Sequence, residues 1–149
     1  MLLFQLFADN PLIVIPWIVA LLVAITAHEF SHGLAAYFLG DTTARDAGRL
    51  TLNPLAHLDL TGSLLLVLVG FGWAKPVPIN PHCIQKGNLG QFFVSIAGVS
   101  SNLIMAFIAI IGLKVSLGVI GLDDLNFLVK FLAFLAYINI ALFVFNLLP

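Results

Sequence analysis

Long apolar runs, separated by one polar stretch, dominate the pattern of positions along the chain. The first run covers residues 12–39, follows an Asp-Asn-Pro sequence typical of a helix start, and ends before Gly40. At 1.5 Å per residue, such a helix is about 42 Å long, whereas the hydrocarbon core of a bilayer is about 30 Å thick. The pattern therefore predicts a helix that crosses a membrane.

Three further apolar runs follow the polar stretch at residues 41–59. Residues 91–115 and 125–148 are long enough to form two more membrane-spanning helices. Residues 60–73 would make a helix of only about 21 Å, so we expect a re-entrant segment there. Residues 49–52 and 76–80 are candidate strands of a small β-hairpin, in which two prolines confine the second strand to an edge.

The predicted fold class is therefore an all-α polytopic membrane protein, with three full transmembrane helices and a short re-entrant segment in one domain over residues 1–149. Composition supports this, because 61% of residues are hydrophobic and 9% are charged, and a soluble domain of this size could not bury so much apolar surface. A net charge of −1 argues against nucleic-acid binding. The single cysteine, Cys83, excludes an internal disulfide and a cysteine-based zinc cage.

The first predicted span contains the sequence His-Glu-Phe-Ser-His at residues 28–32. Two histidines four residues apart on a helix differ by about 40° in direction and 6 Å in rise, so both imidazoles face one point. This arrangement favours Zn²⁺ bound by His28 and His32, with Glu29 as the catalytic general base. An ionisable group in the bilayer centre costs at least about 2.5–3.5 kcal/mol, which argues that the group has a function.

Two questions about this motif stay open at the level of sequence. A membrane transporter or channel could use the same three side chains for protons or metal ions. Glu29 is the only glutamate, and Phe38 stands where a third histidine six residues after His32 would lie, so the third zinc ligand has to be an aspartate or another histidine. The candidates are His57, Asp59, His82, Asp41, Asp46, Asp123 and Asp124.

Over nearly its whole length the chain resembles the site-2 protease family of intramembrane zinc metalloproteases, in its compact branch without PDZ or CBS domains. The resemblance rests on residues 28–32, Gly-Arg-Leu-Thr-Leu-Asn-Pro at 48–54, Gly-Trp-Ala-Lys-Pro-Val-Pro at 72–78, Ala-Gly-Val-Ser-Ser-Asn at 97–102 and Asn-Leu-Leu-Pro at 146–149. It implies a zinc metalloendopeptidase that cuts membrane-spanning or membrane-associated proteins within the lipid bilayer of a prokaryotic plasma membrane. The oligomeric state, including a homo-oligomer, stays open.

The resemblance also assigns residues. It implies that Asn102 stabilises the transition state, whereas a structural hydrogen bond between helices is the alternative. In the family, Asn-Leu-Leu-Pro leads into Leu-Asp-Gly, whose aspartate is the third metal ligand, but this sequence ends at Pro149. We therefore expect a core truncated before that ligand, and an inactive relative is a further alternative.

Sidedness and substrate binding give two more expectations. Four of the six Lys and Arg residues lie within residues 40–89, which favours a cytosolic location for this region and for the active site beside it. A transmembrane substrate must unwind before it can be cut, because a helix hides its own peptide bonds. The β-hairpin near the active site could hold the unwound segment by strand addition.

Overall fold

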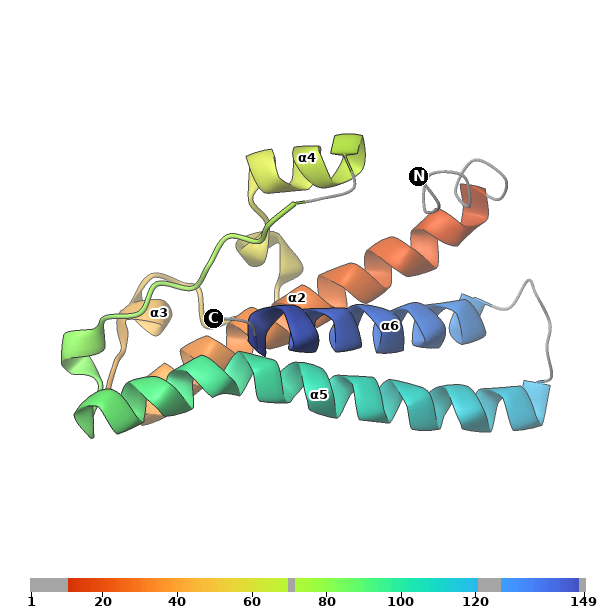
Figure 1. Cartoon of the computed structure of the whole chain (residues 1–149). Coiled ribbons are helices and arrows are strands. Elements are labelled where there is room, and N and C mark those ends of the chain that lie inside the picture. The colour runs from red at the N-terminus through yellow and green to blue at the C-terminus, as the bar shows by residue number, and fades with distance from the viewer. Residues whose placement is uncertain (1–10, 70–71, 121–126, 148–149) are drawn as a thin grey trace. The chain divides into compact units, whose positions relative to one another are not determined.

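The computed structural model describes residues 11–69, 72–120 and 127–147 (Figure 1). Its long helices are α2 (Val14–Phe38, preceded by the 3₁₀ turn η1, Pro11–Ile13), α5 (Gly87–Ile120) and α6 (Phe127–Leu147). All three are long and apolar enough to cross a membrane. The prediction of three transmembrane helices in an all-α protein is thus confirmed, although α5 extends beyond the predicted residues 91–115 at both ends.

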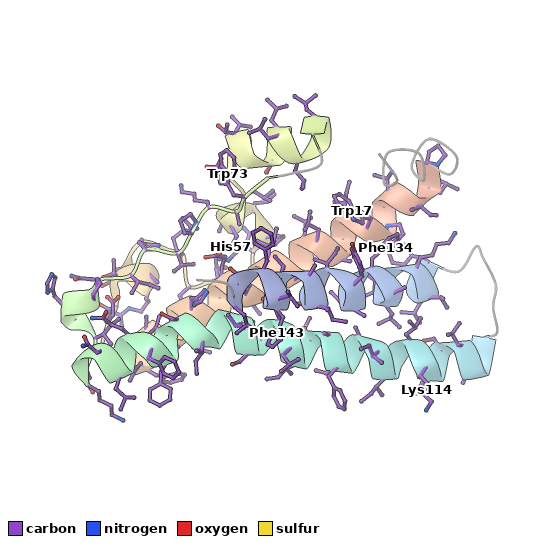
Figure 2. All side chains as sticks on the ribbon, in the orientation of Figure 1. Trp17, His57, Trp73, Lys114, Phe134 and Phe143 are labelled. Atoms are coloured by element: carbon purple, nitrogen blue, oxygen red, sulfur yellow. The ribbon has the colours of Figure 1, made fainter. Side chains whose placement is uncertain are left out.

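Four shorter elements connect α2 to α5: α3 (Thr43–Asp46), η2 (Pro54–His57), α4 (Leu60–Val69) and η3 (Pro81–Cys83). With ten residues, α4 is about 15 Å long, shorter than the hydrocarbon core, as expected for the short apolar segment. The chain returns closely along α4, because a Cβ atom added to Gly62 would lie 2.2 Å from the carbonyl oxygen of Trp73 (labelled in Figure 2). Residues 70 and 71 of the predicted segment lie outside the described residues.

The predicted β-hairpin is wrong. Within the described ranges, pairing between strands is limited to an isolated antiparallel bridge between Leu58 and Ala74. Residues 50–52 form a bend, and Arg49 contacts the second segment through its side chain, not through a backbone ladder. The physical reason is that Pro76 and Pro78 have no N–H to donate, so a ladder over residues 76–80 would lack regular donors.

The chain divides into two compact units, and α2 and α5 are continuous helices that contribute residues to both. In the unit formed by residues 1–24 and 102–149, α6 runs beside the C-terminal part of α5 in the opposite direction (Figure 1). The core of this unit is rich in alanine, which lets helices approach closely; its buried residues are Ala20, Ala24, Ala109, Leu135, Ala136 and Ile138.

The second unit, residues 25–101, contains the C-terminal part of α2, the short elements and the N-terminal part of α5. Its buried apolar cluster consists of Ala36 of α2, Ile84 directly after η3, and Val94 of α5. A backbone hydrogen bond of 2.7 Å from Gln85 N to Leu39 O also ties the end of α2 to the chain that enters α5. These contacts bring α2 and α5 together within the unit that carries the His-Glu-x-x-His sequence.

Candidate metal centre

His28 and His32 lie one helical turn apart on α2, and their side chains converge as the spacing predicts. Their Nε2 atoms are 3.1 Å apart, and the two rings are nearly perpendicular at 84° with centroids 4.6 Å apart. Two nitrogen ligands of a tetrahedral zinc at 2.0–2.1 Å lie about 3.3 Å from each other. The two imidazoles therefore fit a zinc ion as two of its ligands.

A carbonyl group of α5 fixes the orientation of His32. The Nδ1 atom of His32 lies 2.7 Å from the carbonyl oxygen of Val94. Because a carbonyl oxygen can only accept, Nδ1 carries the proton and Nε2 presents its lone pair towards His28. This is the outer hydrogen bond that metal-binding histidines ordinarily make.

Gly98, one turn after Val94 on α5, provides the space in which the histidine pair lies. A Cβ atom added to Gly98 would lie 2.3 Å from Nε2 of His32 and 2.8 Å from Cε1 of His28. Any side chain at this position would therefore collide with the ring atoms that converge. The absence of a side chain at residue 98 therefore leaves the room in which the two rings converge.

Glu29 receives a hydrogen bond from a segment 48 residues away in the sequence. Its Oε2 atom accepts from the backbone N–H of Val77 at 2.9 Å. The Val77 side chain is buried and packs on α2, since a Cβ added to Gly33 would lie 3.2 Å from its Cγ1 atom. Arg49 Nη2 donates to the carbonyls of Lys75 at 2.8 Å and, more weakly, of Pro76 at 3.3 Å.

Among the described residues, no group of three His, Cys, Asp or Glu side chains could hold a metal ion. The predicted candidates for the third ligand have other partners: His57 Nε2 donates to the Thr51 carbonyl, and Asp59 Oδ1 accepts from the N–H of Gly62 in the first turn of α4. Asp46 accepts from Thr42 and Arg45, and His82 is exposed. Asp123 and Asp124 lie outside the described residues.

Asp41, the remaining candidate, is fully buried and uses both carboxylate oxygens in hydrogen bonds. Oδ1 accepts from the N–H and hydroxyl of Thr43, and Oδ2 accepts from the N–H of Asn80 at 2.7 Å. Burial by itself raises the pKa of Asp41, but the hydrogen bonds from Thr43 and Asn80 outweigh this effect and hold the pKa below its usual value. Asp41 is therefore a structural anion whose two oxygens bond to Thr43 and Asn80.

Asn102 belongs to the other compact unit, where it is fully buried. Its Nδ2 atom donates to Oδ1 of Asn139 at 2.7 Å, and Asn139 Nδ2 donates to the Leu135 carbonyl. This pair is the interhelical hydrogen bond that the sequence offered as the structural alternative. The role of Asn102 in the transition state stays a prediction.

Sequence reasoning singled out the three side chains of the motif but assigned no role to Val77, Val94 or Gly98. Val77 and Val94 act through backbone groups, which carry no side-chain signature. A weak signal existed for Val77, because the Pro-Val-Pro sequence leaves its N–H as the one backbone donor in residues 76–78. Gly98 lies in a stretch of small residues, a composition typical of helices that approach closely.

Comparison with known proteins places this arrangement in a family. No family model and no solved structure matches the chain. The chain is 44% identical to the Bacillus subtilis (strain 168) protein named "Putative zinc metalloprotease YwhC" over 148 residues, which cover 96% of this chain and 67% of YwhC. It is 30% and 27% identical to the proteins of Mycolicibacterium smegmatis and Mycobacterium tuberculosis named "Putative zinc metalloprotease Rip2", in each case over 86% of this chain and 49% of Rip2.

The chain thus spans about two thirds of YwhC and about half of Rip2. The similarity to YwhC extends over nearly every residue of the chain, including the helix that carries the converging histidines. This chain belongs to the zinc-metalloprotease family that includes YwhC.

Proposed function

We propose that this chain is the core of an intramembrane zinc metalloendopeptidase of the site-2 protease type. The observation that carries the proposal is the 3.1 Å separation of two histidine nitrogens, with Glu29 between them in sequence, on a helix long and apolar enough to cross a membrane. The names of the related proteins support the metal and the class of reaction. We infer the substrate class from the apolar helix that carries the motif.

His28 and His32 would hold the zinc ion through Nε2, and a third ligand would come from outside the described residues. When bound, zinc supplies a Lewis acid that activates water and polarises a peptide carbonyl. Glu29 takes one proton from the attacking water, whose oxygen bonds to the carbonyl carbon. As the C–N bond breaks, Glu29 delivers that proton to the leaving amine, so one water is consumed for each bond cut.

The proposed substrates are membrane-spanning or membrane-associated proteins, unwound before cleavage. Residues 77–79 lie next to Glu29 through the Val77 bond, and within the described residues the Val77 carbonyl and the Ile79 N–H make no hydrogen bond. These two backbone groups can pair with an extended segment of substrate. Cysteines placed along residues 77–79 should therefore crosslink to a substrate, and a uniform absence of adducts would end this part of the proposal.

Glu29→Gln tests the catalytic assignment. The variant should retain the zinc of the wild type, because residue 29 is not a ligand, and should lose about 10²–10⁴-fold in kcat, the usual contribution of a general acid–base group. Zinc per mole of protein is measured by elemental analysis. Cleavage is measured with fluorescein-labelled casein in detergent, and with a polyleucine transmembrane peptide interrupted by Gly-Pro in liposomes.

The rival functions give different results in the same experiments. A transporter or channel would move protons or zinc across liposomes, would lose this flux in Glu29→Gln and would cut neither probe. An inactive relative would cut neither probe and move no ion. Cleavage of casein alone would support a metalloprotease and overturn the proposed membrane substrates.

A further inference from the structure

Two carboxylates, Glu29 on α2 and Asp41 in the turn that follows α2, hold one extended stretch of chain. We call this stretch, residues 75–80, the proline segment. Val77 N–H donates to Glu29 at 2.9 Å, and Asn80 N–H donates to Asp41 at 2.7 Å. Glu29 is the proposed general base, whereas Asp41 has no assigned role in the reaction.

The proline segment is stiff, so its two attachments are mechanically connected. Pro76 and Pro78 have φ fixed near −65°, and each restricts the residue before it to extended conformations. Asn80 is also extended, with φ −103° and ψ 103°. A displacement at Asn80 is therefore passed along the backbone to Val77, three residues away, with few torsions to absorb it.

The attachment at Asp41 is strong because the carboxylate is fully buried and satisfied. Its other oxygen accepts from the N–H and hydroxyl of Thr43, which fixes the carboxylate relative to the first turn of α3. Charge-assisted bonds of this kind are about twice as strong as neutral ones. At the opposite end of the segment, Arg49 holds the carbonyls of Lys75 and Pro76.

We propose that Asp41 is a positioning residue for Glu29: by holding Asn80, it keeps the Val77 N–H at the distance that orients the Glu29 carboxylate. This inference rests on the proposed function, since it assigns Glu29 its catalytic role. Asp41 touches neither the metal ligands nor, by this account, the substrate. It acts through the backbone of the proline segment.

The kinetic test uses Asp41→Asn, a near-isosteric change that removes the charge and leaves one oxygen to accept bonds. We expect kcat on labelled casein to fall about 10- to 100-fold, the range that loss of a supporting hydrogen bond commonly gives, with zinc stoichiometry unchanged. Thr43→Val is the matched control, because it removes one donor to Asp41 and leaves the bond to Asn80 intact. An unchanged kcat in Asp41→Asn, or an equal loss in the control, would overturn the proposal.

A double-mutant cycle tests whether Asp41 acts through Val77. Val77→Pro removes the N–H that binds Glu29 and keeps the extended backbone. If the two residues form one pathway, the double variant should be no slower than Val77→Pro alone. Independent losses that multiply in the double variant would show that Asp41 acts by another route and would overturn the proposal.

A third measurement does not depend on the folding of an Asp41 variant or on activity. The proline segment contains four amide hydrogens, at Lys75, Val77, Ile79 and Asn80, which simplifies hydrogen exchange followed by mass spectrometry. Coupling is reciprocal, so Glu29→Gln, which weakens the bond to Val77, should also speed exchange at Asn80 several-fold. An exchange rate at Asn80 that is the same in Glu29→Gln and in wild type would overturn the proposed coupling between the two carboxylates. If instead wild-type protein cuts neither probe while Asn80 responds, the proposed function fails and the mechanical link stands.

Discussion

The position at which α5 comes nearest to the histidine pair is Gly98, and Gly98→Ala adds one methyl group there. The new Cβ would lie 2.3 Å from His32 Nε2 and 2.8 Å from His32 Cδ2 and His28 Cε1. Ordinary van der Waals contact begins at 3.4 Å. All three neighbouring atoms belong to rigid rings, so the clash cannot be relieved by the end of a flexible chain.

The structure sets the size of the effect. Restoring contact requires His32 Nε2 and the helix to separate by about 1 Å, the difference between the contact distance and 2.3 Å. Metal–ligand distances are specific to about 0.2 Å, so this displacement is about five times the tolerance of a zinc site. We expect zinc affinity to fall at least 10- to 100-fold, the range produced by loss of an outer-shell partner, because here a ligand itself is displaced.

The assay is zinc retention against a graded series of chelators, with thermal unfolding measured on the same samples. Gly118→Ala on the same helix is the matched control, since a Cβ there has no neighbour within 4 Å. Both variants gain about 1 kcal/mol of helix propensity. Wild-type zinc affinity in Gly98→Ala would refute the reasoning, and so would an equal loss of zinc in Gly118→Ala.

Three further predictions concern other parts of the molecule. Asn102→Ala and Asn139→Ala remove the same buried hydrogen bond, so each should lower the free energy of unfolding by about 0.5–2 kcal/mol in thermal denaturation; a loss of casein cleavage by Asn102→Ala without destabilisation would instead favour a catalytic role. Because the pKa of Asp41 is lowered in the folded state, its carboxylate stabilises the protein fully above about pH 4, and this stabilisation is lost as the pH falls through the folded-state pKa. The difference in free energy of unfolding between wild type and Asp41→Asn should therefore become smaller in acid. A larger difference in acid would contradict this prediction. Gly62→Ala would place a Cβ 2.2 Å from the backbone oxygen of Trp73. In a variant that also lacks Trp17, it should therefore shift the fluorescence emission of Trp73. An unchanged spectrum would show that the chain around Trp73 moves away from α4 without disturbing the indole ring.

The sequence by itself determined the features that depend on local periodicity. Hydropathy and length located the three long helices, because a span of lipid imposes a minimum run of apolar residues whatever the tertiary contacts are. The four-residue spacing of His28 and His32 was enough to predict that their rings converge, since helix geometry alone places them on one face. The short length of residues 60–73 likewise predicted a short helix.

Tertiary structure alone decided what surrounds that motif. The Val94 carbonyl that orients His32 is 62 residues away in the sequence, and the Val77 N–H that binds Glu29 is 48 residues away. No local pattern encodes such pairs, because they depend on which backbone groups remain unbonded once helices and loops pack. The β-hairpin prediction was wrong for the same reason, because the one donor between Pro76 and Pro78 bonds to a carboxylate on α2 and not to a neighbouring strand.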